Sequence, residues 1–198
     1  AVPAVTATRT PPDTTASGRI NLSWGSPETN GAPVESFTIT VDPAHRAPIE
    51  IHNGSQQSHQ VDGLTDGVPY TFRVAATNKA GRGQPGVSSP ATPAALPDQI
   101  ASVTAAPLNN EARLTFTAPS GNGDPIRHYE ASHDGGNWTV ISAGGGSQAP
   151  GSQLTAVVPA QNAQTHTWRV RACNGVGVAV PCGDPSPPSN SVRPYGTP

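Results

Sequence analysis

The sequence predicts an all-β fold, and three features of its 198 residues carry this prediction. Valine outnumbers leucine 17 to 6, and the helix formers Leu, Glu, Lys and Met are scarce. The 21 glycines and 23 prolines follow no collagen-like period and fall between short apolar stretches, as turn residues do. The net charge of −2 lacks the strong imbalance that is typical of disordered chains. We therefore expect short strands joined by Gly/Pro turns.

Charge and hydropathy disfavour two classes of partner. The 11 basic and 13 acidic residues are scattered, whereas a phosphate backbone or an anionic membrane surface requires a dense basic face. No stretch approaches the roughly 18 apolar residues of a membrane-spanning helix. We expect no nucleic-acid partner and no membrane insertion by this segment.

An internal repeat predicts two domains. Residues 30–34 (NGAPV) recur as residues 122–126 (NGDPI), at an offset of 92. Residues 70–74 (YTFRV) recur as residues 166–170 (HTWRV), at an offset of 96. Two blocks in the same order indicate a duplicated domain of about 95 residues. The expected boundaries are a first domain at 1–93, a short Pro-rich, semi-rigid linker at 94–98 and a second domain at 99–198.

Alternation of apolar and polar residues predicts the strands of the first domain. The alternating segments are residues 20–24, 36–41, 49–51 and 70–74. The third segment leads into Asn53-Gly54, a strong hairpin signal, and Val61 falls on the expected return strand.

The second domain repeats this pattern of strands. Its expected strands carry Leu114 and Phe116, Tyr129, Trp138 and Val140, Leu154 and Val157, and Trp168 and Val170. Six or seven short strands in about 95 residues, with turn signals between them, predict an immunoglobulin-like β-sandwich. The predicted fold class is all-β, with two immunoglobulin-like β-sandwiches in tandem and an elongated shape.

The first domain resembles a fibronectin type III domain. Trp24 stands at the position of the family's strand-B tryptophan, and Phe37 stands at the aromatic position of strand C. Leu64 and Tyr70 fit the Gly-Leu-x-x-Gly-x-x-Tyr corner before strand F, and Phe72 follows within that strand. The resemblance implies that these side chains form the core, with the Tyr70 hydroxyl bonded to nearby backbone.

The second domain departs from the family pattern at three positions. Ala118, Ala160 and His166 stand where the family has the tryptophan, the corner leucine and the corner tyrosine. Trp168, at the next inward position, is expected to restore the lost volume, and Tyr129 is the other large aromatic residue of the expected core.

Cys173 and Cys182 lie nine positions apart near the C-terminus. Two thiols with no histidine beside them make a poor zinc site, because structural zinc takes four ligands. A disulfide is favoured, with two buried free thiols as the alternative, and disulfides persist in oxidising compartments. Through the resemblance, Cys173 falls at the end of strand F and Cys182 near the start of strand G, so the disulfide would join the two strands of the F–G hairpin.

The cysteine segment and the Pro-Ser runs after it resemble bacterial, particularly actinobacterial, secreted or cell-envelope versions of the domain. This resemblance implies an exported chain in an extracellular or cell-envelope location. The sequence begins without Met and without a signal peptide, which indicates a processed or excised segment of a longer protein.

Arg82 and Gln84, in the expected F–G loop of the first domain, are candidate interaction residues. The segment Gly81-Arg82-Gly83-Gln84 resembles the integrin-binding Arg-Gly-Asp loop of animal fibronectin-like domains. Gln84 replaces the aspartate whose carboxylate contacts the metal there, and an amide does not supply that charge. The sequence therefore gives no support to integrin binding.

Trp138 is the third candidate for an interaction. It follows the tight-turn signal at residues 134–137 and lies on an expected edge strand. An exposed tryptophan could stack on a sugar ring, but the alternation with Val140 favours packing against the core.

The sequence predicts no metal site and no catalytic site. His45, His52 and His59 recur every seven residues, but a hairpin at Asn53-Gly54 would hold His52 and His59 at its opposite ends. The acidic residues of the second domain are too dispersed for a carboxylate pair, and no nucleophile elbow or phosphate loop is present. We expect no cofactor and no enzymatic activity.

The predicted function is a non-catalytic structural spacer or protein-interaction segment of a larger secreted or cell-envelope bacterial protein. Its expected partners are the neighbouring domains of the same polypeptide, with a protein or a polysaccharide as a further partner. The alternative is a carbohydrate- or protein-binding module that accompanies an extracellular carbohydrate-active enzyme. Fold alone does not choose between them.

Overall fold

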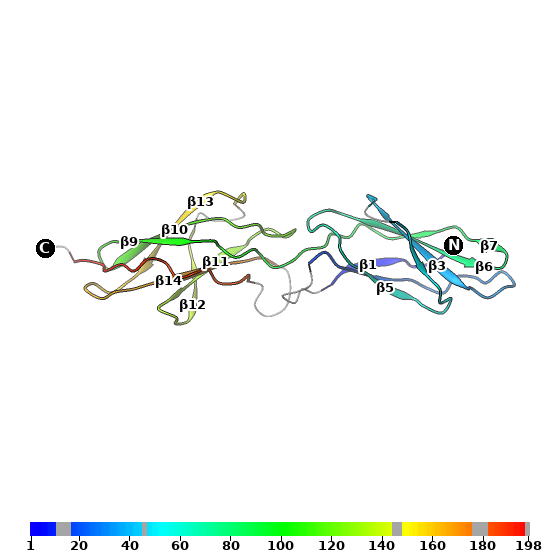
Figure 1. Ribbon diagram of the computed structural model, residues 1–198, viewed down its shortest axis with the longest axis horizontal. Coiled ribbons are helices and arrows are strands. Elements are labelled where there is room, and N and C mark those ends of the chain that lie inside the picture. The colour runs from blue at the N-terminus through cyan, green and yellow to red at the C-terminus, as the bar shows by residue number, and fades with distance from the viewer. Residues whose placement is uncertain (11–16, 45–46, 144–147, 176–181, 197–198) are drawn as a thin grey trace. The chain divides into compact units, whose positions relative to one another are not determined.

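The computed structural model describes residues 1–10, 17–44, 47–143, 148–175 and 182–196. The chain divides into two compact units, Ala1–Ala94 and Ala95–Pro198 (Figure 1). The amides of Ala95 and Asp98 donate hydrogen bonds of 2.9 and 3.0 Å to the carbonyl oxygens of Asn122 and Ser120. Residues 95–98, expected to be part of a linker, are therefore attached to the second unit.

The first unit contains two antiparallel sheets. One has the order β1-β2-β5, and the other has the order β4-β3-β6-β7 with β8 paired to β6. The strands are β1 (Thr6–Arg9), β2 (Ile20–Ser23), β3 (Ser36–Asp42), β4 (Ile49–Ile51), β5 (Ser58–Val61), β6 (Thr71–Asn78), β7 (Gly81–Arg82) and β8 (Gly86–Val87). In β2, Ile20 and Leu22 are buried while Asn21 and Ser23 are not, so the period-two pattern of the sequence is the pattern of burial.

The second unit contains two three-stranded antiparallel sheets with the orders β13-β10-β9 and β12-β11-β14. The strands are β9 (Val103–Pro107), β10 (Glu111–Thr117), β11 (His128–His133), β12 (Trp138–Ile141), β13 (Gln153–Pro159) and β14 (Trp168–Cys173). Leu154 and Val158 of β13 are buried, whereas Val157 is 50% exposed. Leu154 and Val157 both lie on the expected strand, but they point to opposite faces of the sheet because they are three residues apart.

The secondary structure across the described residues consists of strands, turns and bends, as predicted. None of those residues form a helix of the length and hydropathy that a membrane crossing requires.

The core of the first unit contains the aromatic and aliphatic residues that the family resemblance selected. The ring centroids of Trp24 and Phe37 lie 5.3 Å apart, and Leu64, Tyr70 and Phe72 are buried with them. The hydroxyl of Tyr70 accepts a 3.1 Å hydrogen bond from the amide of Thr65. The Tyr70 side chain thus fills the core with its ring and satisfies a turn amide with its oxygen.

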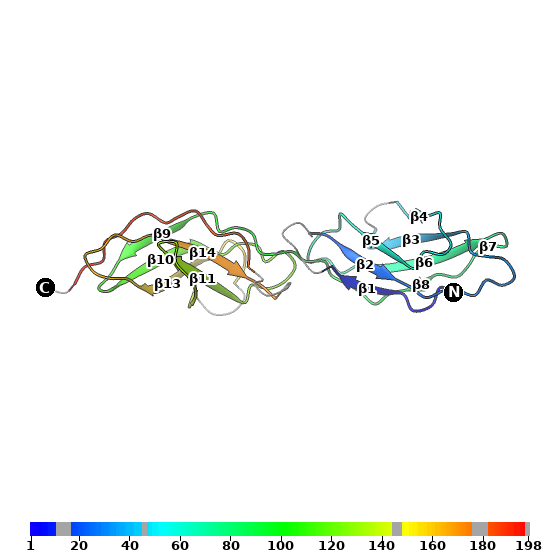
Figure 2. The ribbon, with the colours of Figure 1, turned by 90° about the horizontal axis from the view of Figure 1, so that it is seen from below.

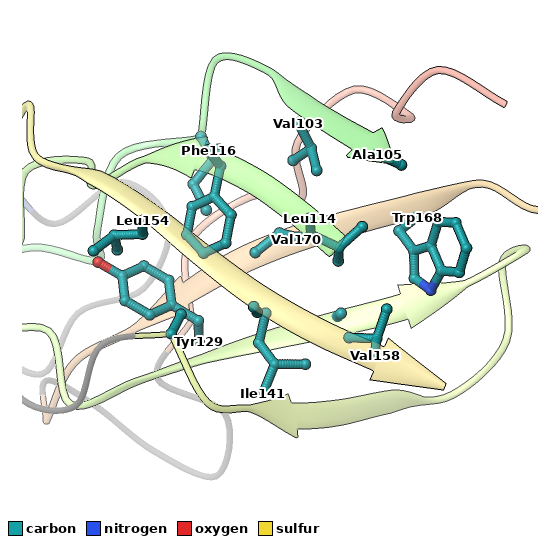
Figure 3. Packing of buried hydrophobic residues seen from close by; sticks show 14 of the residues in the cluster. Val103, Ala105, Leu114, Phe116, Tyr129, Ile141, Leu154, Val158, Trp168 and Val170 are labelled. Atoms are coloured by element: carbon teal, nitrogen blue, oxygen red, sulfur yellow. The ribbon is translucent and has the colours of Figure 1, made fainter. Parts of the chain in front are cut away.

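The core of the second unit is built around Trp168, Tyr129 and Phe116, which lie among smaller buried residues (Figure 3). The ring centroids of Phe116 and Tyr129 are 5.2 Å apart in an edge-to-face arrangement. Trp168 is 2% exposed, whereas Ala118 and Ala160 replace the larger residues of the first unit. The second unit therefore fills its core from β14, where the first unit uses Trp24 and Leu64.

The predicted hairpin at Asn53-Gly54 was wrong. β4 pairs with β3, and β5 pairs with β2, so these consecutive strands belong to different sheets (Figure 2). The turn itself is present, because the Asn53 side chain accepts a 3.0 Å hydrogen bond from the amide of Ser55. A Cβ at Gly54 would overlap the carbonyl of Val34, so the turn requires glycine for close backbone approach.

The repeated Asn-Gly blocks form the same turn in both units. Asn30 and Asn122 have φ values of 48° and 50°, and the glycine after each also has positive φ. Across the turn, the side-chain amide of Asn78 donates to the carbonyl of Thr29, and that of Asn174 donates to the carbonyl of Gly121. The two units therefore share this side-chain contact as well as the sequence of the turn.

Candidate functional site

The outer side of the β12-β11-β14 sheet carries a strip of large side chains, here called the Trp138 face: Glu130, Trp138, Val140 and Arg171. The strand registers pair Glu130 with both Val140 and Arg171, which places these side chains on one side of the sheet. The guanidinium of Arg171 lies 4.3 Å from the ring centroid of Trp138. Val140 is 66% exposed, so the strip is open to solvent.

The expectation that Trp138 packs against the core was wrong. Ile141, the neighbour of Val140, is the buried residue of β12, so the alternation runs in the opposite phase. Trp138 is half-buried because Arg171 covers part of its ring, not because it enters the core. The prediction that it lies on an edge strand is confirmed, since β12 ends its sheet.

An ion pair organises the Trp138 face. The Nε and Nη2 atoms of Arg171 lie 2.8 and 2.7 Å from Oε2 of Glu130. The other Glu130 oxygen lies 3.5 Å from Nε2 of His128. Glu130 and Arg171 are only 17% and 18% exposed, so the pair is held in a partly desolvated position that fixes the guanidinium against Trp138.

Cys173 and Cys182 form a disulfide beside this face, as the sequence predicted. Cys173 ends β14 and forms an isolated antiparallel bridge with Cys182. The amide of Gly183 donates a 2.9 Å hydrogen bond to the carbonyl of Ala172, which extends the pairing past the disulfide. The disulfide thus links the strand that carries Arg171 to the chain segment next to it.

His166 replaces the corner tyrosine and keeps its structural role by a different bond. In the first unit, Tyr70 bonds to the backbone of the residue five positions earlier, Thr65. In the second unit, Nε2 of His166 lies 3.0 Å from the carbonyl oxygen of Gln161, which is also five positions earlier. The imidazole therefore forms the corner bond with one nitrogen and leaves the other for a second contact.

That second nitrogen belongs to a compact cluster with His133 and Asp134. Nδ1 of His166 lies 2.7 Å from Nε2 of His133 and 3.0 Å from Oδ2 of Asp134. The His133 nitrogen lies 3.2 Å from the same carboxylate oxygen. His133 ends β11 and its ring stacks on Trp168 at a centroid distance of 5.1 Å, so the core tryptophan orients it.

The pKa of Asp134 is lowered from its ordinary value. Burial acts in the opposite direction, but it is outweighed by hydrogen bonds from the Thr167 amide, His166 and the Thr167 hydroxyl, and by the charge of His133. The folded pKa lies below the unfolded one, so the stabilisation is present at neutral pH and is lost as the pH falls through the folded value.

The interaction candidates of the first unit lie beside a small cleft. Arg82 and Gln84 line a cavity of about 200 Å³ together with residues of the loop after β2 and of the N-terminal segment. Arg82 belongs to β7, and the amide of Gly83 donates a 2.8 Å hydrogen bond to the carbonyl of Ala76. The cleft is open to solvent and presents mixed polar and apolar groups.

The regularly spaced histidines of the first unit do not form the cluster that the structure contains. His52 is exposed in the turn after β4, and His59 lies on β5 in the other sheet. His45 lies outside the described residues. The sequence reasoning missed His133 as a partner of His166, and the available signal was the histidine at the corner-tyrosine position.

Comparison with known proteins matches residues 6–92 to one family model. This segment matches the model of the fibronectin type III domain. Human myomesin-2 is 26% identical in an alignment 189 residues long that covers 88% of this chain and 13% of that protein. Human neural cell adhesion molecule L1 is 34% identical in an alignment 88 residues long that covers 41% of this chain and 7% of that protein. The chain thus spans a small part of these relatives.

Two further matches also align most of this chain with only part of a longer chain. Fibronectin type-III domain-containing protein 3A from Pongo abelii is 29% identical over 170 residues, covering 80% of this chain and 14% of that protein. The crystal structure of the chicken CNTN1 FN1-FN3 domains covers 97% of this chain and 67% of its own, with 17% identity and a TM-score of 0.44. These relatives are animal proteins and give no support to the expected bacterial origin. Residues 6–92 therefore match the fibronectin type III domain model, and the two antiparallel sheets of each unit give the chain an all-β fold of two sandwiches.

Proposed function

We propose that the chain is a non-catalytic structural spacer and protein-interaction segment of a larger exported protein. The observation that supports this most is the path of the chain through each unit. In both units the chain enters at one end of the sandwich and leaves at the other end. A domain with this path separates the segments on either side of it by its own length.

The path through the first unit follows from three contacts. The carbonyl of Pro3 accepts a 2.9 Å hydrogen bond from the amide of Gly25. Gly25 begins the loop that Asn78 contacts at the end of β6, so the chain enters the unit at this end. At the other end, Ala91 pairs with Tyr70, just before β6 begins. The eight residues of β6 separate these ends by about 26 Å.

The second unit is traversed in the same direction. The carbonyl of Ala95 accepts a 2.8 Å hydrogen bond from the side chain of Asn174, which follows β14. Val192 pairs with His166, which precedes β14. Asn174 corresponds to Asn78 and His166 to Tyr70, so the repeat reproduces the path of the chain as well as the sandwich.

The proposed exported location rests on the disulfide. A disulfide between Cys173 and Cys182 persists in an oxidising compartment and is rare in the cytosol. The name of one relative, a neural cell adhesion molecule, fits such a setting for that protein. For this chain we propose only that it is located in an oxidising compartment.

Small-angle X-ray scattering of the chain tests the spacer function. A compact globule of 198 residues has a radius of gyration of about 16 Å. A spacer should give a clearly larger value in solution, at both low and moderate ionic strength. A radius near 16 Å would show that the units fold back on one another and would contradict the proposal.

The Trp138 face supports a second candidate function, a binding module for a protein or a polysaccharide. Trp138 lies on the edge strand β12, faces outward and contacts the guanidinium of Arg171. The two side chains together offer apolar area and hydrogen-bond donors to a partner. Co-sedimentation with insoluble polysaccharides should then be reduced by Trp138→Ala. The matched control is Val157→Ala, which removes an exposed side chain from the opposite sheet. Equal retention of both variants and the unsubstituted chain would exclude Trp138 as a polysaccharide-binding residue.

A further inference from the structure

We propose that His133, Asp134 and His166 form a binding site for a divalent transition-metal cation of the zinc class. Two imidazole nitrogens and one carboxylate oxygen meet with separations of 2.7, 3.0 and 3.2 Å. Imidazole and carboxylate groups are common zinc ligands, and three protein ligands with one open position is a frequent arrangement. This goes beyond the spacer function and does not depend on it.

The bond between His166 and Gln161 determines which nitrogen of His166 is available. A carbonyl oxygen only accepts, so Nε2 of His166 carries the hydrogen that is donated to Gln161. In the neutral ring Nδ1 then presents a lone pair, and this lone pair faces the Asp134 carboxylate at 3.0 Å. Two electron-rich atoms in this position require a hydrogen or a cation between them, and the nitrogen of His133 that lies 2.7 Å from Nδ1 can either donate that hydrogen or join them as a third metal ligand. A metal-bound histidine commonly donates its second nitrogen to a backbone carbonyl in this way.

The carboxylate is oriented by its other oxygen. Oδ1 of Asp134 accepts hydrogen bonds of 2.7 and 3.1 Å from the amide and the hydroxyl of Thr167. Only Oδ2 is directed at the two imidazoles. Asp134 has a φ of 46° in the β11–β12 turn, and its Oδ2 lies 3.2 Å from Nε2 of His133.

The spacing of the three atoms suits a small tetrahedral cation. Ligand atoms that share one tetrahedral zinc ion at bond lengths near 2.1 Å lie about 3.4 Å from one another. The observed separations of 2.7, 3.0 and 3.2 Å reach that value with shifts of about 0.7, 0.4 and 0.2 Å, which side-chain rotation supplies. The His166 side chain is 4% exposed, but His133 and Asp134 are 42% and 44% exposed, so the cation and a fourth ligand such as water have access from solvent.

Isothermal titration calorimetry with zinc chloride tests the site. The oxidised chain is titrated without reductant, because free thiols at Cys173 and Cys182 would themselves ligate zinc. We expect saturable binding of one ion per chain. His133→Gln and Asp134→Asn should each weaken the affinity at least about 10-fold. Magnesium, which prefers an all-oxygen shell, should not compete.

Two matched variants serve as controls for this titration. His52→Gln removes an exposed histidine of the first unit, and His128→Gln removes a histidine of β11 that contacts Glu130 instead of the cluster. Both should bind zinc as the unsubstituted chain does. His133 and Asp134 are exposed, so their variants should retain the fold, which circular dichroism checks. Absence of one-to-one binding, or unchanged affinity in His133→Gln and Asp134→Asn, would overturn the proposal.

Discussion

The two buried tyrosines should respond in opposite ways to the loss of a hydroxyl group. Tyr70 accepts a 3.1 Å hydrogen bond from the Thr65 amide, whereas the Tyr129 hydroxyl has no hydrogen-bond partner among the described residues. Tyr70→Phe leaves a turn amide without its acceptor, at a cost of about 1–1.5 kcal/mol in the free energy of unfolding. Tyr129→Phe removes a buried polar atom that no bond compensates, so it should be neutral or stabilise by up to about 1 kcal/mol.

Native-state hydrogen exchange with mass-spectrometric detection measures both variants in their own unit. Tyr70→Phe should increase the exchange rate of the β6 amides by about 5- to 13-fold and leave the β10 amides unchanged. Tyr129→Phe should leave β6 unchanged and keep or slow the exchange of β10. The two substitutions remove the same atom, so each is the control for the other. Equal destabilisation by both would refute the reasoning that bond satisfaction distinguishes them.

Three further predictions concern stability. Replacing Cys173 and Cys182 by serine should destabilise the second unit by about 2–3 kcal/mol, seen as a lower urea midpoint for that unit only; an unchanged midpoint would deny the disulfide a stabilising role. Burial raises the pKa of Tyr129, so the unfolded state ionises first and the free energy of unfolding, constant below the ordinary pKa of 10.0, falls as the pH rises toward the folded value. Tyr129→Phe should therefore flatten the alkaline limb of a stability–pH curve, and an identical limb would count against this. Gly54→Ala should cost about 1–3 kcal/mol because its Cβ meets the Val34 carbonyl, and a urea midpoint equal to that of the unsubstituted chain would be inconsistent with this contact.

The fold could be predicted largely because its signals are local or repeated. The alternation at Ile20 and Leu22 reports directly on burial, and the Asn30 and Asn122 turns share both sequence and conformation. The turn at Asn53 was found, but not the sheet to which its second strand belongs. The residues of a turn determine that the chain reverses direction there. Which strand the next segment pairs with depends on the position of the other sheet.

The candidate sites were harder to predict, since they depend on which face of a strand points to the core and on contacts between residues far apart in the sequence. Trp138 and Val140 share a face, as the alternation requires, but only the packing of Ile141 decides that this face points outward. The contact between His133 and His166 joins residues 33 positions apart, and no local spacing reports it. Arg171 likewise reaches Trp138 from another strand of the sheet.

The proposed spacer holds its two neighbouring segments apart, one at each end of the chain. The most direct measurement is the distance between two spin labels, one on Glu28→Cys and one on Asn109→Cys. Glu28 lies in the loop at the end of the first unit where the chain enters that unit. Asn109 lies in a turn at the end of the second unit where the chain leaves that unit. Both positions are exposed, and labelling without reductant preserves the disulfide. A spacer predicts a distance distribution centred well above about 42 Å, the diameter of a compact globule of this length. A distribution centred below that diameter would contradict the spacer function.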